Sequence, residues 1–307
     1  MTARQLSVPF LLLILAIRPL DAASEPPPYG TEAVARRIDI GGRYLNIACL
    51  GQGRPTVVLD HALGGSSRDW RHVQRGLAAT TRVCSYDRAG YGHSDAGPGP
   101  RTSSRIASEL RTLMDRAELL PPYLLAGHSF GGYNVRAFAD LFPDETAGLV
   151  LLDSPHEEQA DRFFQTEAMR RLDPHGSIQY LWDSEILGSL SAVDLEPFAR
   201  LLGARSASMQ GIIGEIAGFA ESSRELRSFP NRDKVPVVVI AHGRRVLTGG
   251  ALSDQLEDQW LSLQKDLASR FKHHRFIVAE HSGHTIPLEQ PGLVIDAIKR
   301  LILEHRP

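Results

Sequence analysis

One serine of the sequence lies in a setting typical of a catalytic nucleophile. The apolar run 122–127 leads into Gly127-His128-Ser129-Phe130-Gly131, and a pattern typical of a helix begins at once. Glycines are expected around such a serine, because a strained strand-to-helix turn leaves little room for a Cβ atom. The turn also places the serine at a helix N-terminus, where backbone N–H groups favour a developing negative charge. The pentapeptide alone is a weak pattern, but its position between a strand and a helix favours a nucleophile over a tight structural turn.

The elements that would position this serine alternate along the chain between strand and helix. Several short runs are apolar almost throughout, as is typical of strands covered on both faces. We expect strands at residues 35–40, 43–50, 55–60, 82–87, 122–127, 147–153, 235–241 and 274–280, and helices at 103–119, 134–142 and 292–305. This alternation predicts an α/β fold with a mostly parallel sheet.

The alternation stops between residues 155 and 231, where helical patterns occur without a strand pattern. We interpret this segment as a helical cap insertion on a core made of residues 25–154 and 232–307. Its aromatic residues would either line a pocket or form a small core of the insertion itself.

The overall composition excludes some classes of partner. The chain has 307 residues, 42% of them hydrophobic and 23% charged, with a formal net charge of −2. These values are ordinary for a globular protein, and the sequence has no cluster of Lys and Arg of the kind that nucleic-acid binding needs. Because it also has no Cys/His cluster at zinc spacing and no Gly-rich phosphate loop, we expect no metal and no cofactor. The oligomeric state cannot be predicted.

The N-terminal residues 1–24 have the three-part pattern of a secretory signal peptide. Arg4 supplies a positive charge, residues 8–17 are apolar, and Ala22-Ala23-Ser24 offers a cleavage site. The apolar run is shorter than the ~20 residues that cross a bilayer, so we expect no stable membrane span after cleavage. The pattern predicts a secreted or periplasmic protein; a disordered or membrane-touching N-terminus is the alternative.

The spacing of Cys49 and Cys84 permits either one disulfide or two buried thiols.

Four segments in order resemble the α/β-hydrolase superfamily, over nearly all of the chain after residue 30. VVLDHALGGSSRDW (57–70) resembles the oxyanion loop after the third strand, and YDRAGYGHSD (86–95) resembles the loop after the fourth strand. AGHSFGG (126–132) resembles the nucleophile elbow, and SGHTIPLEQP (282–291) resembles the C-terminal histidine loop. The resemblance implies an α/β-hydrolase fold with a mostly parallel eight-stranded sheet flanked by helices.

The resemblance also implies roles for residues outside the elbow. His284 would be the general base, since imidazole can take and return a proton near neutral pH. His281 is its nearest competitor, and His128 is expected to pack behind the end of the sheet. The backbone N–H groups of Leu63 and Phe130 would form the oxyanion hole. Where the family usually has Gly after the histidine of this loop, the chain has Ala62, whose Cβ narrows the conformations allowed there.

The acid of the triad departs from the usual family position after the seventh strand. There, Gly243 is followed by Arg244 and Arg245 instead of a carboxylate. Asp153 ends the sixth predicted strand and could reach the same place, because the carboxyl ends of parallel strands line one crevice. The stretch resembles a bacterial subgroup with the acid after this strand, and the resulting order of Ser129, Asp153 and His284 is the order that this fold uses.

Other interpretations of the acid stay open. Asp153 could simply begin a Ser-Pro turn, the acid could be Asp254, or a Ser-His dyad could work without an acid. Asp254, Glu257 and Asp258 are expected on a helix that runs away from the site. Arg244 and Arg245 would bind an anionic group of the substrate if they face the crevice; a solvent-facing loop is the alternative.

The family resemblance implies two further expectations. Its usual strand order places the second and fourth strands side by side, so we hypothesise a disulfide between Cys49 and Cys84.

The expected function is that of a serine hydrolase that cleaves a carboxylic ester or a related acyl bond of a small molecule through an acyl-enzyme. Cofactor-free haloperoxidase or lyase chemistry on the same triad is one alternative, and a non-catalytic binding protein with this fold is another. The natural substrate cannot be predicted.

Overall fold

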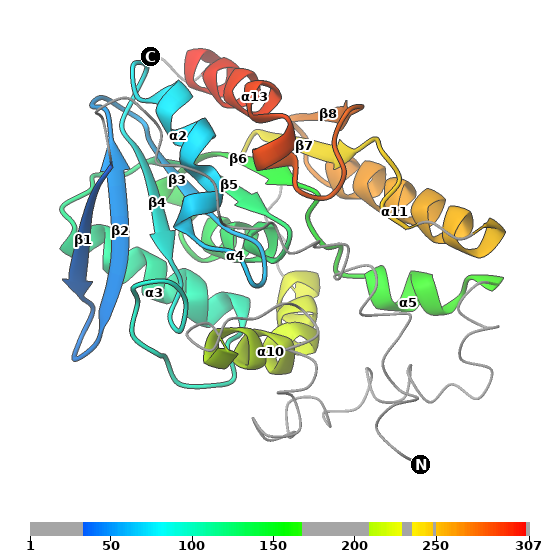
Figure 1. Ribbon diagram of the computed structural model, residues 1–307, viewed down its shortest axis with the longest axis horizontal. Coiled ribbons are helices and arrows are strands. Elements are labelled where there is room, and N and C mark those ends of the chain that lie inside the picture. Colours follow the sequence, from blue (N-terminus) through cyan, green and yellow to red (C-terminus); the bar gives the residue numbers. More distant parts are fainter. Residues whose placement is uncertain (1–32, 168–208, 229–234, 248–249, 305–307) are drawn as a thin grey trace, which may run out of the picture.

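Eight strands form one sheet in the computed structural model, which describes residues 33–167, 209–228, 235–247 and 250–304. They are β1 (Val34–Asp39), β2 (Tyr44–Leu50), β3 (Thr56–Asp60), β4 (Val83–Asp87), β5 (Tyr123–His128), β6 (Thr146–Leu152), β7 (Val237–His242) and β8 (His274–Ala279), in the order β1-β2-β4-β3-β5-β6-β7-β8 (Figure 1). β1 and β2, and β2 and β4, pair antiparallel. The pairs from β4 to β8 are parallel. All eight predicted strands and the mostly parallel sheet are confirmed.

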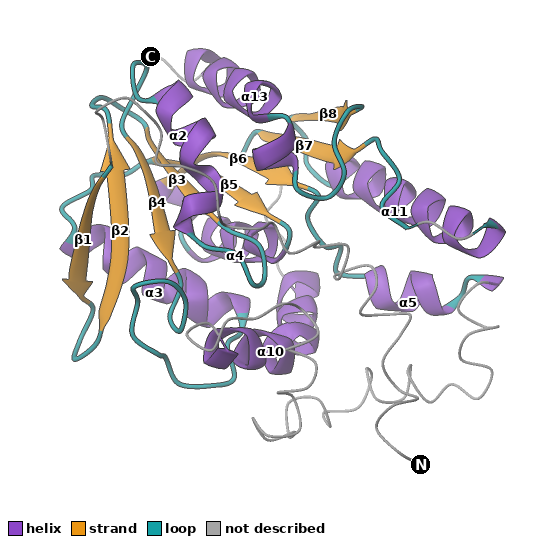
Figure 2. Cartoon of the chain, viewed as in Figure 1, coloured by secondary structure: helices purple, strands orange, loops and turns teal. Residues whose placement is uncertain are grey.

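Helices cover both faces of this sheet (Figure 2). α2 (Arg71–Leu77) and α13 (Pro291–Glu304) pack on one face, together with the short η1 (Ser67–Trp70) and α12 (Ile286–Glu289). α3 (Ser103–Arg116), α4 (Phe130–Leu141), α10 (Met209–Ser228) and α11 (Ala251–Ser269) contribute to the core on the other face, and η2 (Pro143–Glu145) joins α4 to β6. In β3, Val57 and Leu59 face the first layer and Val58 faces the second, as expected when successive side chains of a strand point to opposite faces.

The predicted insertion lies between β6 and β7. Its described residues form α5 (Gln159–Phe164) and α10 and contain no strand, as the sequence predicts. α10 contacts α3 and α4, and α5 contacts α11. Residues 168–208 and 229–231 of the predicted insertion, and the predicted leader 1–24, lie outside the described residues. Among the helices that are described, none is long and apolar enough to cross a bilayer.

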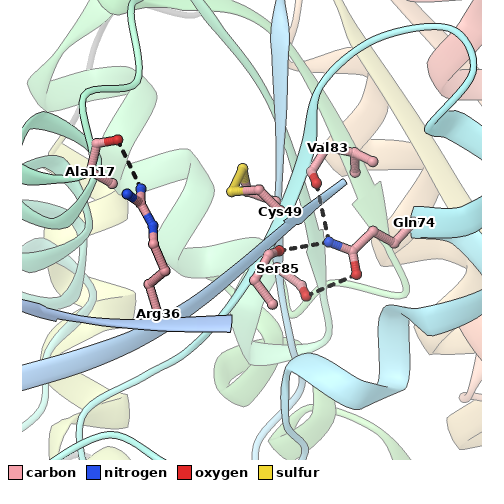
Figure 3. The surroundings of a disulfide bond; sticks show 8 residues. Arg36, Cys49, Gln74, Val83, Ser85 and Ala117 are labelled. Atoms are coloured by element: carbon pink, nitrogen blue, oxygen red, sulfur yellow. Dashed lines mark hydrogen bonds between the residues drawn. A yellow bond between two sulfur atoms is a disulfide. The ribbon is translucent and has the colours of Figure 1, made fainter. Parts of the chain in front are cut away.

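The hypothesised disulfide is present and joins two neighbouring strands (Figure 3). Cys49 of β2 and Cys84 of β4 are register partners, their Cα atoms lie 4.1 Å apart and their sulfurs are bonded. Gln74 of α2 holds the same two strands, because its Nε2 donates to Ala48 O at 2.6 Å and to Val83 O at 3.1 Å. The bridge therefore reinforces the antiparallel part of the sheet.

Removal of this bridge should destabilise the protein strongly. The disulfide closes a loop between cysteines 35 positions apart, and loop-closure entropy predicts that the double variant Cys49→Ala/Cys84→Ala loses about 3–4 kcal/mol of unfolding free energy. Urea unfolding followed by circular dichroism measures the difference. Dithiothreitol should lower the stability of the wild-type protein to that of the variant and leave the variant unchanged. Equal stability of the two oxidised proteins would contradict the prediction.

Candidate active site

Ser129 lies at the tight turn between β5 and α4. Its backbone has φ 52° and ψ −125°, a left-handed conformation that non-glycine residues rarely adopt, and its N–H donates to Leu152 O of β6 at 2.9 Å. A Cβ atom on Gly127 would lie 2.3 Å from Gly131 O, and one on Gly131 would lie 2.5 Å from Asp60 O. The glycines are thus required for the reason expected from the sequence, namely the close packing of backbone around the serine.

His284 is paired with Asp153 across the carboxyl ends of β6 and β8. Its Nδ1 lies 2.6 Å from Asp153 Oδ2. Since an ionised carboxylate can only accept, Nδ1 carries a proton, and in the neutral ring Nε2 is then the nitrogen that can accept one. Nε2 is buried and has no hydrogen-bond partner within the described part of the chain. The arrangement leaves a basic nitrogen available for a reacting group.

His128 links the elbow to the loop that carries His284. The two imidazole rings lie 4.9 Å apart between centroids, and His128 Nε2 donates to the backbone oxygen of His284 at 2.7 Å. Burial lowers the pKa of His128 to about 3, so the ring is neutral. The expectation that His128 packs behind the end of the sheet is wrong, because the ring lies against His284.

Ser129 and His284 form no hydrogen bond with each other in the described residues. A hydrogen bond between nucleophile and base often forms only when substrate binds.

Asp153 is fully buried directly after β6 and has a positive φ of 46°. Besides His284, its carboxylate accepts from Trp260 Nε1 at 2.8 Å, from His242 Nδ1 at 2.7 Å and from the His242 backbone N–H at 3.2 Å. Burial by itself would raise the pKa of Asp153, but the charge and hydrogen bonds of His242 and His284 outweigh it and hold the pKa well below its usual range. Asp153 is therefore an ionised carboxylate.

The other candidate acids of the sequence lie differently. Asp254 is exposed and binds Arg245 at 2.8 Å, and Asp258 binds Arg245 at 2.9 Å. Arg244 pairs with Glu289. Both arginines are thus engaged in ion pairs at the surface, as expected for a solvent-facing loop. Among the described acidic residues, only Asp153 has a hydrogen bond to His284.

Three residues of this cluster were not predicted as site residues from the sequence, namely His242 at the end of β7 and Glu257 and Trp260 in α11. The expectation that Glu257 lies on a helix leading away from the site is wrong, because α11 packs along β7. Glu257 Oε2 lies 2.9 Å from His242 Nε2. Glu257 and Trp260, three positions apart on one helix face, both reach the cluster. That spacing was the available signal, but it identifies a shared helix face without saying what the face contacts.

The predicted oxyanion donors lie where two loops meet beside the elbow. Phe130 is the first residue of α4, so its N–H has no partner within the helix. Leu63 is buried in the turn that follows β3, and neither N–H donates a hydrogen bond within the described chain. Among described non-glycine residues, positive φ occurs only at Glu118, Ser129 and Asp153. Ala62 therefore needs no glycine-like conformation.

A buried arginine fixes the loop that carries Leu63. Arg88 Nη1 donates to His61 O at 2.5 Å and Nη2 to Ala62 O at 3.2 Å. The same guanidinium pairs with Asp60 at the end of β3 and with Glu215 of α10, both at 2.5 Å. Arg88, Asp60 and Glu215 are all fully buried, so this network ties a helix of the predicted insertion to the loop beside the elbow.

Among the residues that the structure describes, two groups of His, Asp and Glu have ligand atoms within 4.8 Å of one another, namely Asp153 with His242 and His284, and His156 with Glu158 and Asp266. In the first group, both Nδ1 atoms already point at Asp153 Oδ2. In the second, the carboxylates of Glu158 and Asp266 pair with Arg162 and Arg270. Hydrogen bonds and ion pairs account for both groups, and we assign no metal site to either.

Comparison with known proteins gives several matches. A family model described as the alpha/beta hydrolase fold matches residues 55–174. The chain is 25% identical over 249 residues to the uncharacterized protein YqjL of Bacillus subtilis, a match that covers 81% of this chain and 83% of that protein. It is 29% identical over 137 residues to epoxide hydrolase 4 of Mus musculus, over 44% of this chain and 38% of that protein. A thermophilic esterase from Thermogutta terrifontis has a TM-score of 0.62 at 24% identity, over 89% of this chain and 99% of that chain. The segment matched by the family model contains Ser129 and Asp153, and His284 lies outside it.

Proposed function

We propose that the chain, which has the α/β-hydrolase fold, is a serine hydrolase that cleaves a carboxylic ester or a related acyl bond of a small molecule. The observation that carries the proposal is the 2.6 Å hydrogen bond between His284 Nδ1 and Asp153 Oδ2. It fixes the tautomer of His284 with its basic Nε2 free, next to the loop that presents Ser129.

Each residue of the site has a defined role in this mechanism. Ser129 Oγ attacks the acyl carbon while His284 Nε2 takes the hydroxyl proton, and Asp153 stabilises the imidazolium that forms. The N–H groups of Leu63 and Phe130 bind the negative oxygen of the tetrahedral intermediate, each contributing a few kcal/mol of stabilisation. His284 then returns the proton to the leaving alcohol. Water resolves the acyl-enzyme by the same steps in reverse.

The comparisons support hydrolysis as the reaction class. The similar proteins include one named as an epoxide hydrolase and a solved structure named as an esterase. The identity to the esterase is 24%, which supports a shared fold, and the choice of an acyl substrate rests on the geometry of Ser129, His284 and Asp153.

Covalent labelling combined with turnover tests the proposed function. The purified protein should hydrolyse short p-nitrophenyl esters, and a fluorophosphonate should add one phosphonyl group to the peptide that contains Ser129, detected by mass spectrometry. A chain-length series from acetate to octanoate would define the acyl preference. Labelling of Ser129 without turnover of any ester would favour other chemistry on the same triad or a binding role. Absence of both would contradict the proposal.

We also propose that the protein is exported and loses residues 1–24 during export, and that residues 155–231 cap the site. Export is supported by the pattern of the leader and by the Cys49–Cys84 bridge, since disulfides persist in oxidising compartments. The cap is supported by Glu215 of α10, which reaches Arg88 beside the oxyanion loop. N-terminal sequencing of protein recovered from the periplasm or medium should begin near residue 24.

A further inference from the structure

His242 lies between two carboxylates at the end of β7. Its Nδ1 is 2.7 Å from Asp153 Oδ2, and its Nε2 is 2.9 Å from Glu257 Oε2. The three side chains are almost fully buried, with exposed fractions of 9% for His242, 0% for Asp153 and 6% for Glu257. The catalytic steps proposed above use Asp153 but neither of the other two.

The hydrogen bonds define the protonation state of this imidazole. An ionised carboxylate has no proton to donate, so each ring nitrogen of His242 must be the donor, and only the imidazolium carries a proton on both nitrogens. Burial by itself would raise the pKa of Glu257, but the hydrogen bond and charge of His242 and the N–H groups of Val246 and Leu247, which donate to Oε1 at 2.9 and 2.6 Å, outweigh it and lower the pKa, so Glu257 is an ionised acceptor. The chain thus places a buried cation next to the acid of the proposed triad.

We propose that His242 is a positioning residue whose imidazolium, held by Glu257, fixes the Asp153 carboxylate and offsets part of its charge opposite His284. This inference rests on the proposed function, because it assigns Asp153 and His284 their triad roles. The order of charges is Glu257 negative, His242 positive, Asp153 negative, then His284. A permanent cation beside Asp153 offsets part of the attraction that this carboxylate exerts on a positive charge at His284.

The other charged groups near His242 leave this balance in place. Arg244 and Arg245 follow it in the chain, but each pairs with carboxylates at the surface. Trp260 of α11 stacks near the ring with 6.3 Å between centroids and carries no charge. Burial lowers the pKa of His242, but Asp153 and Glu257 outweigh it and raise the pKa to about 10. This direction agrees with the hydrogen-bond geometry.

The protonation state can be measured without any assay of activity. In ¹⁵N-histidine-labelled protein, His242 should show two protonated ring nitrogens at pH 7 and keep them to about pH 9 or above. His242→Asn assigns the signal by its disappearance. Glu257→Gln keeps the size of the side chain but removes its charge, so His242 should lose its proton at a pH at least one unit lower than in the wild type. A neutral His242 ring at pH 7 would overturn the proposal.

The pH profile of ester hydrolysis separates positioning from a purely structural role. In His242→Asn, the amide still donates to Asp153 but the cation is gone, so the acidic limb of kcat/KM should move up by about one pH unit. Glu257→Gln should move it in the same direction by less. Arg245→Gln, which removes a surface cation, serves as the control and should leave the limb unchanged.

The two proposals fail in different ways. An acidic limb that stays in place in both His242→Asn and Glu257→Gln, while ester hydrolysis persists, would overturn the role of His242 and leave the serine hydrolase proposal intact. If His242→Asn does not fold, Glu257→Gln alone decides. Absence of ester hydrolysis in the wild-type protein would contradict the proposed function, and the ring signals of His242 would still report whether the buried cation exists.

Discussion

Replacement of Ser129 by alanine should abolish ester hydrolysis, lowering kcat on the order of 10⁶-fold, the size of effect known for loss of a serine nucleophile. The variant keeps the Cβ atom and therefore adds no strain at the positive φ of 52°. The hydroxyl makes no hydrogen bond within the described residues, so the fold should be retained. Initial rates with p-nitrophenyl acetate, together with a thermal unfolding curve, measure both effects.

A matched serine distinguishes this loss from a general disturbance of the site. Ser154 is fully buried directly after Asp153, and within the described chain its hydroxyl donates to the neighbouring Pro155 O alone, at 3.2 Å. Ser154→Ala should retain kcat within about tenfold, since it removes only this local hydrogen bond. If Ser129→Ala kept more than 1% of kcat while Ser154→Ala was inactive, Ser129 would not be the nucleophile.

The strands could be predicted because a strand that is buried on both faces consists of a short run of apolar residues. β3 and β5 are buried at every position, and strands covered on both faces are continuous apolar runs. The start of α4 at Phe130 agrees with the expectation that Ser129 lies at a helix N-terminus, although the apolar spacing of a helix was recognised only from residue 134. Gly131 and Gly132 are poor helix formers, but they are required at these positions because Asp60, at the end of β3, and Ser154, after β6, leave no room for a Cβ atom.

The site residues that lie in short sequence motifs could be predicted, and those brought together by tertiary packing could not. Ser129 is contained in one motif, and the choice of Asp153 over Asp254 required only the order of the strands. His242 and Glu257 lie 15 positions apart, and their contact depends on how α11 packs against β7. Tertiary packing of this kind has no short sequence pattern. His242 directly precedes Gly243, but no local pattern marks its contact with Asp153.

Asp153→Asn should lower kcat by about 10⁴-fold, as expected when the residue that orients the catalytic histidine loses its charge. An asparagine amide can turn its NH₂ group toward His284, which then presents Nδ1 as the acceptor and places its proton on Nε2, where the serine needs a base. Steady-state rates on p-nitrophenyl acetate measure the loss. In the proposed mechanism, KM should change far less than kcat, because Asp153 does not touch substrate.

The matched control for this variant is Asp254→Asn. Asp254 is exposed and, among the described residues, forms an ion pair with Arg245 alone. An exposed ion pair contributes about 0–1 kcal/mol, so this variant should keep wild-type activity and stability. Asp153→Asn should in addition lower the unfolding temperature, because the His242 imidazolium then keeps only Glu257 as a charged partner. If Asp153→Asn lost less than tenfold in kcat while Asp254→Asn was inactive, the acid would lie on α11. The 2.6 Å contact between Asp153 and His284 would then have a structural role only.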